Sequence, residues 1–346
     1  MLLEGLFLPI ATPFYPDGRL NLRKIEHNVD RYSRTPAAGL AVLSDVGEPE
    51  MLTDAETREA LTSAISLAVD TKVMLAGVSR ASVFATLELV EHAAAVGYDA
   101  VLIKRPGASV ERPQELLTYF QAIADRSPLP IVLYSTRLEA MPVEAIAALA
   151  SHPRIIGLVD EDSAVNRITQ LQAATVSLRH DVTVTTVFAA VTGRMLAVKE
   201  AAGAATFVSA EMLGAGAAVA TAPPKPAIKT RTKPVGFQII TASSTGMLDG
   251  LRAGAVGAMP AFAASAPQAS YEVYAAWKDG DQALADVKQA RLASAIEVVE
   301  QRFGLAGVRY ASELTGYFGG RPRLPVLPLS GDAREAVERV MKGIRN

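Results

Sequence analysis

The sequence contains no cysteine, which excludes disulfide bonds, thiolate nucleophiles and zinc sites with cysteine ligands. The formal net charge is only -2, so no basic field is present that would attract nucleic acid or an anionic membrane. No uninterrupted apolar run approaches the ~20 residues of a membrane span. The opening residues, MLLEGLFLPIATPF, also lack the basic start and long apolar stretch of a signal peptide. We therefore expect a cytoplasmic protein that binds neither nucleic acid nor membrane.

What the chain does contain is a regular alternation of short apolar runs and longer amphipathic segments. Half of the 346 residues are apolar, which is enough for a sizeable core. The continuous hydrophobicity of the runs is typical of parallel strands that are covered on both faces. Eight β/α units over about 250 residues predict an α/β fold, a (β/α)₈ TIM barrel, over residues 1–262. The runs cover residues 5–11, 39–44, 72–78, 99–104, 130–134, 154–159, 236–242 and 256–262.

Two regions depart from this alternation. After residue 262 only helical patterns follow, so residues 263–346 are predicted to form a C-terminal helical extension. The sixth and seventh runs are separated by far more than one helix and its loops. The surplus, about residues 176–235, contains an Ala/Gly-rich run over 201–222 and a basic, proline-rich stretch after it. We interpret it as an insertion after the sixth unit, which either covers the cavity mouth or extends a subunit contact.

Active sites of such barrels lie at the carboxyl ends of the strands, and here these ends carry distinctive residues. The fourth run ends in Lys104 and the fifth in Tyr134, followed by Arg137. The sixth run, in RIIGLVDEDS, ends in Val159 and three consecutive acids. A strand that ends in ionisable groups is where we expect the chemistry.

Six segments resemble the dihydrodipicolinate synthase / N-acetylneuraminate lyase family of class I pyruvate aldolases. They are LPIATPFYPDGRLN (8–21), VGEPEMLTDAE (46–56), PIVLYSTR (130–137), SHPRIIGLVDEDS (151–163), ITASSTGMLDGLRAGAVGAM (240–259) and GLAGVRYASELTGYFGGRPRLPVLPLS (304–330). The resemblance implies a homotetramer of barrels, or at least a homo-oligomer, that needs no cofactor. It also implies a lysine that forms a Schiff base with pyruvate, a tyrosine that assists proton transfer and a loop that binds the pyruvate carboxylate.

Carried over residue by residue, the resemblance makes Tyr134 the proton relay. The substrate-binding positions are then Thr12, Ser44, Asp45, Gly47, Glu48, Arg137 and Val159. The position that matches the Schiff-base lysine holds Val159, which has no nucleophile. Asp45 and Val46 replace the family's two hydroxyl residues, and an aspartate there would repel an incoming carboxylate.

Three alternatives could supply the missing chemistry. Lys199, in MLAVKEAAG, resembles a family lysine motif but lies 65 residues after Tyr134, whereas Val159 lies 25 after it. Lys104 could have taken over from another strand end. Acids could instead hold a divalent metal for Lewis-acid chemistry, although we expect no metal site. The acids in question are Asp45, Glu48, Asp160, Glu161 and Asp162.

Two functions follow as hypotheses. The first is a lyase or aldolase-like enzyme that acts on pyruvate, another small 2-oxo acid or an aldehyde, with a mechanism altered by the loss of the lysine. The second is a non-catalytic barrel that binds a metabolite or a partner chain.

Overall fold

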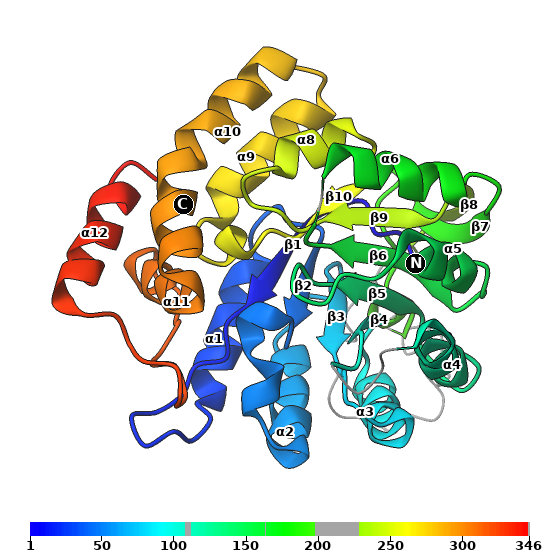
Figure 1. Cartoon of the computed structure of the whole chain (residues 1–346), viewed down its shortest axis with the longest axis horizontal. Helices are drawn as coiled ribbons and strands as arrows, with labels where there is room; N and C mark the ends of the chain where they lie inside the picture. The colour runs from blue at the N-terminus through cyan, green and yellow to red at the C-terminus, as the bar shows by residue number, and fades with distance from the viewer. Residues whose placement is uncertain (108–111, 163, 198–227, 345–346) are drawn as a thin grey trace, which may run out of the picture.

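The computed structural model describes residues 1–107, 112–162, 164–197 and 228–344. Within these ranges, eight parallel strands close into a barrel, in the order β1-β10-β9-β6-β5-β4-β3-β2 (Figure 1). Each strand coincides with one of the predicted apolar runs, so the predicted barrel is confirmed. The strands are β1 (Gly5–Ile10), β2 (Gly39–Val42), β3 (Val73–Gly77), β4 (Ala100–Lys104), β5 (Ile131–Ser135), β6 (Ile155–Asp160), β9 (Gln238–Thr241) and β10 (Gly257–Ala258).

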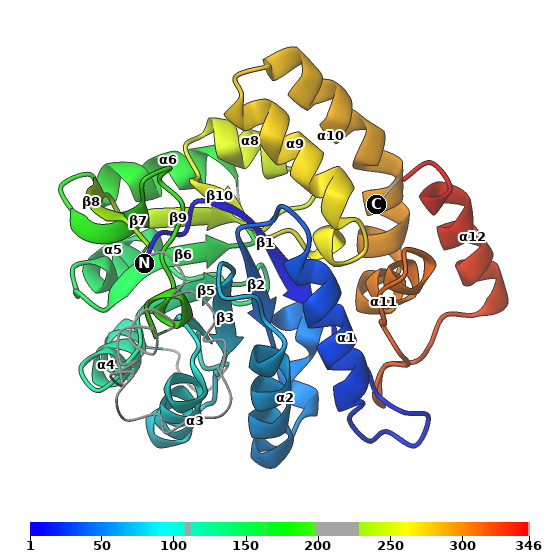
Figure 2. The same cartoon turned by 180° about the vertical axis from the view of Figure 1, so that it is seen from behind.

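Helices surround the barrel, and those of the C-terminal part pack beside α9 and α1, on one side of the ring (Figures 1 and 2). None of the described helices is long and apolar enough to cross a bilayer. The ring contains α1 (Leu22–Ser33), α2 (Asp54–Ser66), α3 (Val83–Val96), α4 (Pro113–Ala124), α5 (Val143–Ala150), α6 (Val165–Ala174), α8 (Met247–Arg252) and α9 (Pro267–Lys278). The extension contains α10 (Gln282–Ile296), the π-helix η5 (Glu297–Arg302), α11 (Gly304–Leu314) and α12 (Gly331–Met341).

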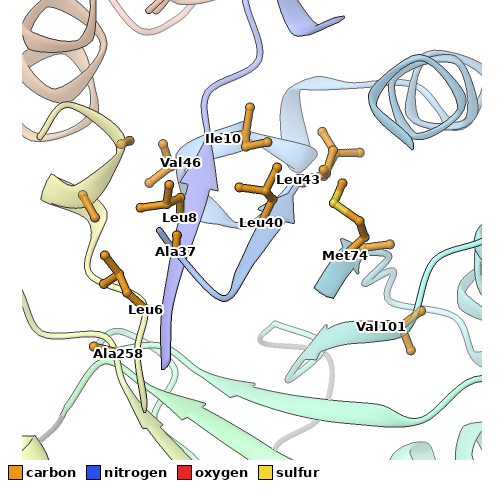
Figure 3. Packing of buried hydrophobic residues seen from close by; sticks show 14 of the residues in the cluster. Leu6, Leu8, Ile10, Ala37, Leu40, Leu43, Val46, Met74, Val101 and Ala258 are labelled. Atoms are coloured by element: carbon orange, nitrogen blue, oxygen red, sulfur yellow. The ribbon is translucent and has the colours of Figure 1, made fainter. Parts of the chain in front are cut away.

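Strand side chains alternate between two apolar clusters, as the pleat of a barrel strand requires. On β1, Leu6, Leu8 and Ile10 join the outer cluster, which packs against the helices (Figure 3). Phe7, between them, points into the barrel interior with Leu75 and other residues of the inner cluster. Both clusters are buried, which explains why the runs are continuously apolar.

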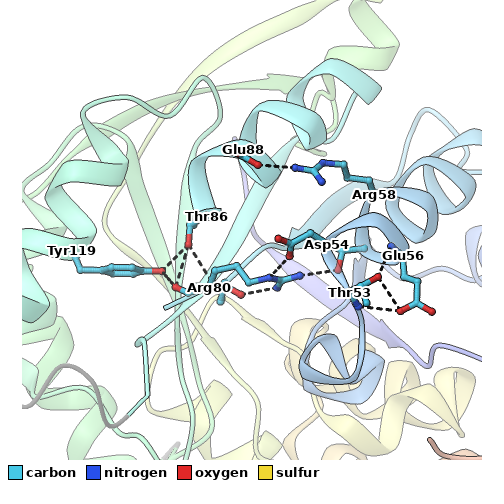
Figure 4. Close-up of polar contacts among 10 residues, drawn as sticks. Thr53, Asp54, Glu56, Arg58, Arg80, Thr86, Glu88 and Tyr119 are labelled. Atoms are coloured by element: carbon cyan, nitrogen blue, oxygen red, sulfur yellow. Dashed lines mark hydrogen bonds and ion pairs between the residues drawn. The ribbon is translucent and has the colours of Figure 1, made fainter. Parts of the chain in front are cut away.

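Local sequence signals set where the elements begin. Thr53 and Glu56 form the predicted capping box at the start of α2, with the Thr53 side chain accepting from the Glu56 N–H. Beside it, Arg80 of the loop after β3 pairs with Asp54 at 2.7 Å (Figure 4). At the end of β3, a Cβ on Gly77 would lie 1.8 Å from the Leu43 carbonyl oxygen. Only glycine therefore lets the loop after β2 cross at this point.

Described residues of the insertion form a two-stranded antiparallel sheet, β7 (His180–Thr185) with β8 (Thr230–Val235). It lies near the N-terminus of the chain (Figure 2), and Lys233 of β8 pairs with Glu4 at 3.2 Å. Further along the insertion, Arg194 pairs with Asp99, just before β4, at 3.2 Å. These contacts place the described flanks at the amino-terminal end of the barrel.

The expectation that the insertion covers the cavity mouth is therefore wrong for these flanks. The physical reason is direction: α6 returns the chain to the amino-terminal end, so an insertion after α6 begins at the end opposite the cavity. The Ala/Gly-rich run 201–222 and Lys199 lie outside the described residues.

Candidate functional site

A cavity of about 720 Å³ opens at the carboxyl end of the barrel. Its floor includes Tyr134, Ala242 and Met259, which belong to the inner cluster of the barrel. Three carboxyl groups and one guanidinium line its wall, namely Asp45, Glu161, Glu300 and Arg137. Such a mixture of an apolar floor and a few convergent polar groups is typical of small-molecule sites.

Tyr134 and Glu161 form the central pair of the cavity. Tyr134 Oη donates to Glu161 Oε1 at 2.8 Å, and the Arg137 N–H donates to Glu161 Oε2 at 3.0 Å. Burial, and then the negative charge of Asp45, raise the pKa of the Glu161 carboxyl. Burial, with Asp45 and Glu161 nearby, also raises the pKa of Tyr134. The tyrosine is therefore a hydrogen-bond donor at neutral pH, and the raised pKa of Glu161 suits a group that exchanges protons.

Val159 lies directly beside Tyr134, because the two residues are paired in the register of β5 and β6. It is fully buried and belongs to the same inner cluster as Tyr134. The β6 end thus presents an isopropyl group where the resemblance implies a lysine. Glu161, two residues after Val159, is the nearest ionisable residue in the sequence that lines the cavity.

Asp45, on the cavity wall, forms an ion pair with Lys104, which does not line the cavity. Lys104 Nζ donates to Asp45 Oδ1 at 2.7 Å and also pairs with Glu50. Burial lowers the pKa of Lys104, but the charges of Asp45 and Glu50 outweigh it and raise this pKa overall. An imine-forming lysine needs the opposite shift. Lys104 lines a separate depression of about 470 Å³ with Glu50 and Arg80, so this geometry favours an ion-pair role for it.

Glu300 enters the cavity from the π-helix η5, whose wider turn is a common feature of functional sites. Its Oε2 accepts a hydrogen bond from the Ser244 hydroxyl in the loop after β9. Burial raises the pKa of Glu300, and hydrogen bonds from Ser244 and the Phe262 N–H oppose this only in part. No sequence motif marks Glu300, which lies 139 residues after Glu161.

Three of the remaining predicted binding positions, Thr12, Gly47 and Glu48, lie behind the cavity wall and do not line the cavity. Thr12 Oγ1 donates to the Gly47 carbonyl at 2.6 Å. Glu48 is buried and paired with Arg309 of α11, which also donates to the Thr12 carbonyl at 2.9 Å. Ser44, by contrast, lines the cavity. Of the seven predicted binding residues, the structure thus brings Ser44, Asp45 and Arg137 to the cavity lining.

The five acids considered for a metal site do not gather. Asp160 points to α6, where Arg167 Nε donates to it at 2.7 Å, and Glu48 faces Arg309. Within the described residues, no group of three or more His, Cys, Asp or Glu side chains is arranged to hold a metal ion. In this arrangement Asp160 and Asp162 face Arg167, and the five acids do not converge on one point.

Comparison with known proteins gives one consistent result. The sequence pattern of the Dihydrodipicolinate synthetase family matches residues 2–182 and 228–344. A 4-hydroxy-tetrahydrodipicolinate synthase from Exiguobacterium is 24% identical over 341 residues, which cover 98% of this chain and 97% of that protein. The enzyme of the same name from Xanthomonas campestris is 32% identical over 185 residues, which cover 52% of this chain and 60% of that protein.

Solved structures agree on the fold. A chloride-inhibited dihydrodipicolinate synthase from Acinetobacter baumannii, in complex with pyruvate, superposes with a TM-score of 0.77 at 20% identity, covering 99% of both chains. A dihydrodipicolinate synthase family protein from Coccidioides immitis gives a TM-score of 0.74 at 22% identity, covering 98% of this chain and 94% of that one. At these identities the structures establish the barrel and not the reaction.

Proposed function

Because this chain belongs to the dihydrodipicolinate synthetase family, we propose that its carboxyl-end cavity binds pyruvate or another small 2-oxo acid and runs lyase chemistry without an imine at position 159. The observation that carries the proposal is the Tyr134–Glu161 hydrogen bond of 2.8 Å inside the cavity. It supplies an acid/base pair beside a β6 end that holds valine.

The proposed step is a cleavage next to a carbonyl group. The Glu161 carboxylate removes the proton of the hydroxyl group at C4 of a 4-hydroxy-2-oxo acid. The C3–C4 bond breaks, an aldehyde leaves, and the electron pair moves to the C2 carbonyl oxygen. The Tyr134 hydroxyl, which donates to Glu161 in the free site, turns its hydrogen to that oxygen when substrate is bound, and Glu161 returns the proton to C3. Arg137 supplies the cation for the substrate carboxylate.

Exchange of the pyruvate methyl protons with deuterium tests this proposal, because it needs only enolisation. Proton NMR in D₂O should show exchange that depends on Tyr134 and Glu161. Borohydride treatment with pyruvate, followed by mass spectrometry, should give no lysine adduct. An adduct at Lys199 or Lys104 would replace the proposal by a relocated imine.

A second function, a barrel that binds a metabolite without turnover, is favoured by one observation. Among the described residues that line the cavity there is no lysine, and Val159 has no nucleophile. Saturable pyruvate binding together with an exchange rate no faster than in buffer would support this binding function.

We also propose that the protein forms a homo-oligomer, and we favour a tetramer over a dimer. Support comes from the family and from exposed apolar side chains such as Leu138, which is 97% exposed beside the cavity. One structural relative is described as a monomeric dihydrodipicolinate synthase variant, so the family does not fix the assembly. Light scattering gives the mass directly, and a monomer of 36.5 kDa would contradict the proposal.

A further inference from the structure

Glu300 is held at the cavity wall by a short series of hydrogen bonds that begins at Ser244. Ser244, which is 4% exposed, donates to one carboxyl oxygen of Glu300 and accepts from the Phe262 N–H at 3.2 Å. Gln289 of α10 donates to the Ser244 carbonyl at 3.0 Å and so ties the loop after β9 to the extension. A carboxylate has about four acceptor sites. The donors that contact Glu300, Ser244 and the Phe262 N–H, leave acceptor capacity at the cavity wall.

The charged groups around Glu300 determine which chemical group of a ligand its free acceptor sites can bind. Glu161 lies close enough for its charge to raise the pKa of Glu300, whereas Arg137 lowers it. Asp45 is already paired with Lys104 at 2.7 Å. If Arg137 binds the substrate carboxylate, Glu161 and Glu300 are left facing the rest of the substrate. A cationic group in that place would lie near Arg137, whose positive charge opposes it. A neutral hydroxyl donor has no such cost.

We infer that Glu300, carried by the π-helix η5, is a specificity-determining residue that accepts a hydrogen bond from a hydroxyl group on the distal part of the substrate. The inference rests on the proposed function, since it concerns the same cavity. It places the carboxylate end of the substrate at Arg137, the reacting carbons at Tyr134 and Glu161, and a hydroxyl-bearing tail at η5. Residues of the C-terminal extension then select the substrate, while the barrel strands act on it.

Ligand-observed NMR titration with three compounds tests this assignment and also reports any cleavage. The compounds are 2-oxohexanoate, its 4,5,6-trihydroxy counterpart and the cationic 5-guanidino-2-oxopentanoate. We expect the wild-type protein to bind the trihydroxy compound about tenfold or more tightly than 2-oxohexanoate, as one hydrogen bond to a charged group warrants. Glu300→Gln should lose most of this preference, and it should bind 2-oxohexanoate at least as tightly as the wild-type protein does, because the change removes a negative charge near an anionic ligand.

A matched control lies in the same helix. Glu297 is exposed and does not line the cavity, so Glu297→Gln should keep the preference. Ser244→Ala, which releases Glu300, should reduce the preference in part. Unchanged preference in Glu300→Gln, or tighter binding of the guanidino compound than of the trihydroxy compound, would overturn the inference and leave the proposed function standing. A wild-type protein that binds none of the three compounds would overturn both.

Discussion

Both ends of the barrel contain buried carboxyl groups, but the partners of these groups differ. At the amino-terminal end, Asp99 accepts from the Met74 and Gly193 N–H groups at 2.9 and 3.1 Å and pairs with Arg194 at 3.2 Å. Every one of these partners comes from a neighbouring strand or from the insertion. Ala190 of the insertion packs against the inner cluster, so this end is closed by protein.

At the carboxyl end, carboxyl groups of the same type line a cavity. Burial raises the pKa of Asp45, Glu161 and Glu300, and their hydrogen-bond donors oppose this shift only in part. Burial raises the pKa of Asp99 in the same direction, so the two ends differ in what surrounds the acid: protein groups complete Asp99, whereas Asp45, Glu161 and Glu300 face a cavity. The comparison teaches that an acid contributes to stability at one end and to chemistry at the other, depending on whether protein or a ligand completes its surroundings.

The largest effect that would sharpen this comparison is expected from Glu161→Gln. An amide cannot act as the base, so deuterium exchange into pyruvate should fall by at least about 100-fold. The free energy of unfolding should stay within about 0.5 kcal/mol or rise, because a carboxyl with a raised pKa is removed. Asp162→Asn is the control, since its side chain is half-exposed beside Glu161 and does not line the cavity. Full exchange activity in Glu161→Gln would show that the carboxyl end has no acid/base role there.

The barrel strands and some of the cavity residues could be predicted from the sequence, whereas contacts between distant segments could not. Continuous apolar runs predicted every barrel strand, because parallel strands are buried on both faces. Tyr134 and Asp45 could be placed at strand ends for the same reason. Glu300 could not, since it reaches the cavity only through the packing of the extension on the barrel. The pairing of Glu48 with Arg309 also has no local signal, because 261 residues separate the partners.

At the amino-terminal end, Asp99→Ala should lower the free energy of unfolding by about 2–3 kcal/mol. The change leaves two backbone N–H groups and the Arg194 guanidinium without their buried acceptor. Denaturant unfolding measures the loss. Pyruvate exchange per folded molecule should not change, because the cavity lies at the other end. A variant with normal stability but reduced exchange would reverse the roles assigned to the two ends.

The pH dependence of pyruvate binding should distinguish the acids that line the cavity from acids elsewhere in the protein. Pyruvate is an anion throughout the neutral range, so it binds best when a cavity carboxyl is protonated. Because the pKa values of Asp45, Glu161 and Glu300 are raised, affinity should fall as the pH increases above the ordinary carboxyl range and through these raised values. NMR titration from pH 5 to 8 should show a decrease of about tenfold. Glu161→Gln should flatten the curve, and an affinity that rises with pH would exclude proton uptake by these groups.

The smallest effect concerns an acid at the same end but outside the cavity. Hydrogen bonds from Arg323 and from the Thr53 N–H lower the pKa of Glu56 to about 2. The pKa shift of Glu56 is therefore opposite in direction to the shifts of the cavity acids. A lowered pKa in the folded state contributes stability that is present above the unfolded value of about 4.5 and is lost as the pH falls toward 2. Because Glu56 is partly exposed, with 24% of its side chain accessible, solvent screening limits the effect.

Glu56→Gln should therefore lower the free energy of unfolding by about 1 kcal/mol at pH 7 and by less at pH 3, since the wild-type carboxylate is then beginning to protonate. Glu59→Gln, at an exposed position of the same helix, serves as the control. Denaturant unfolding at both pH values gives the difference. If the free energy of unfolding lost in Glu56→Gln instead grew as the pH fell, Glu56 would behave like the cavity acids. The contrast between carboxyl groups completed by protein and those left for a ligand would then fail at this end of the barrel.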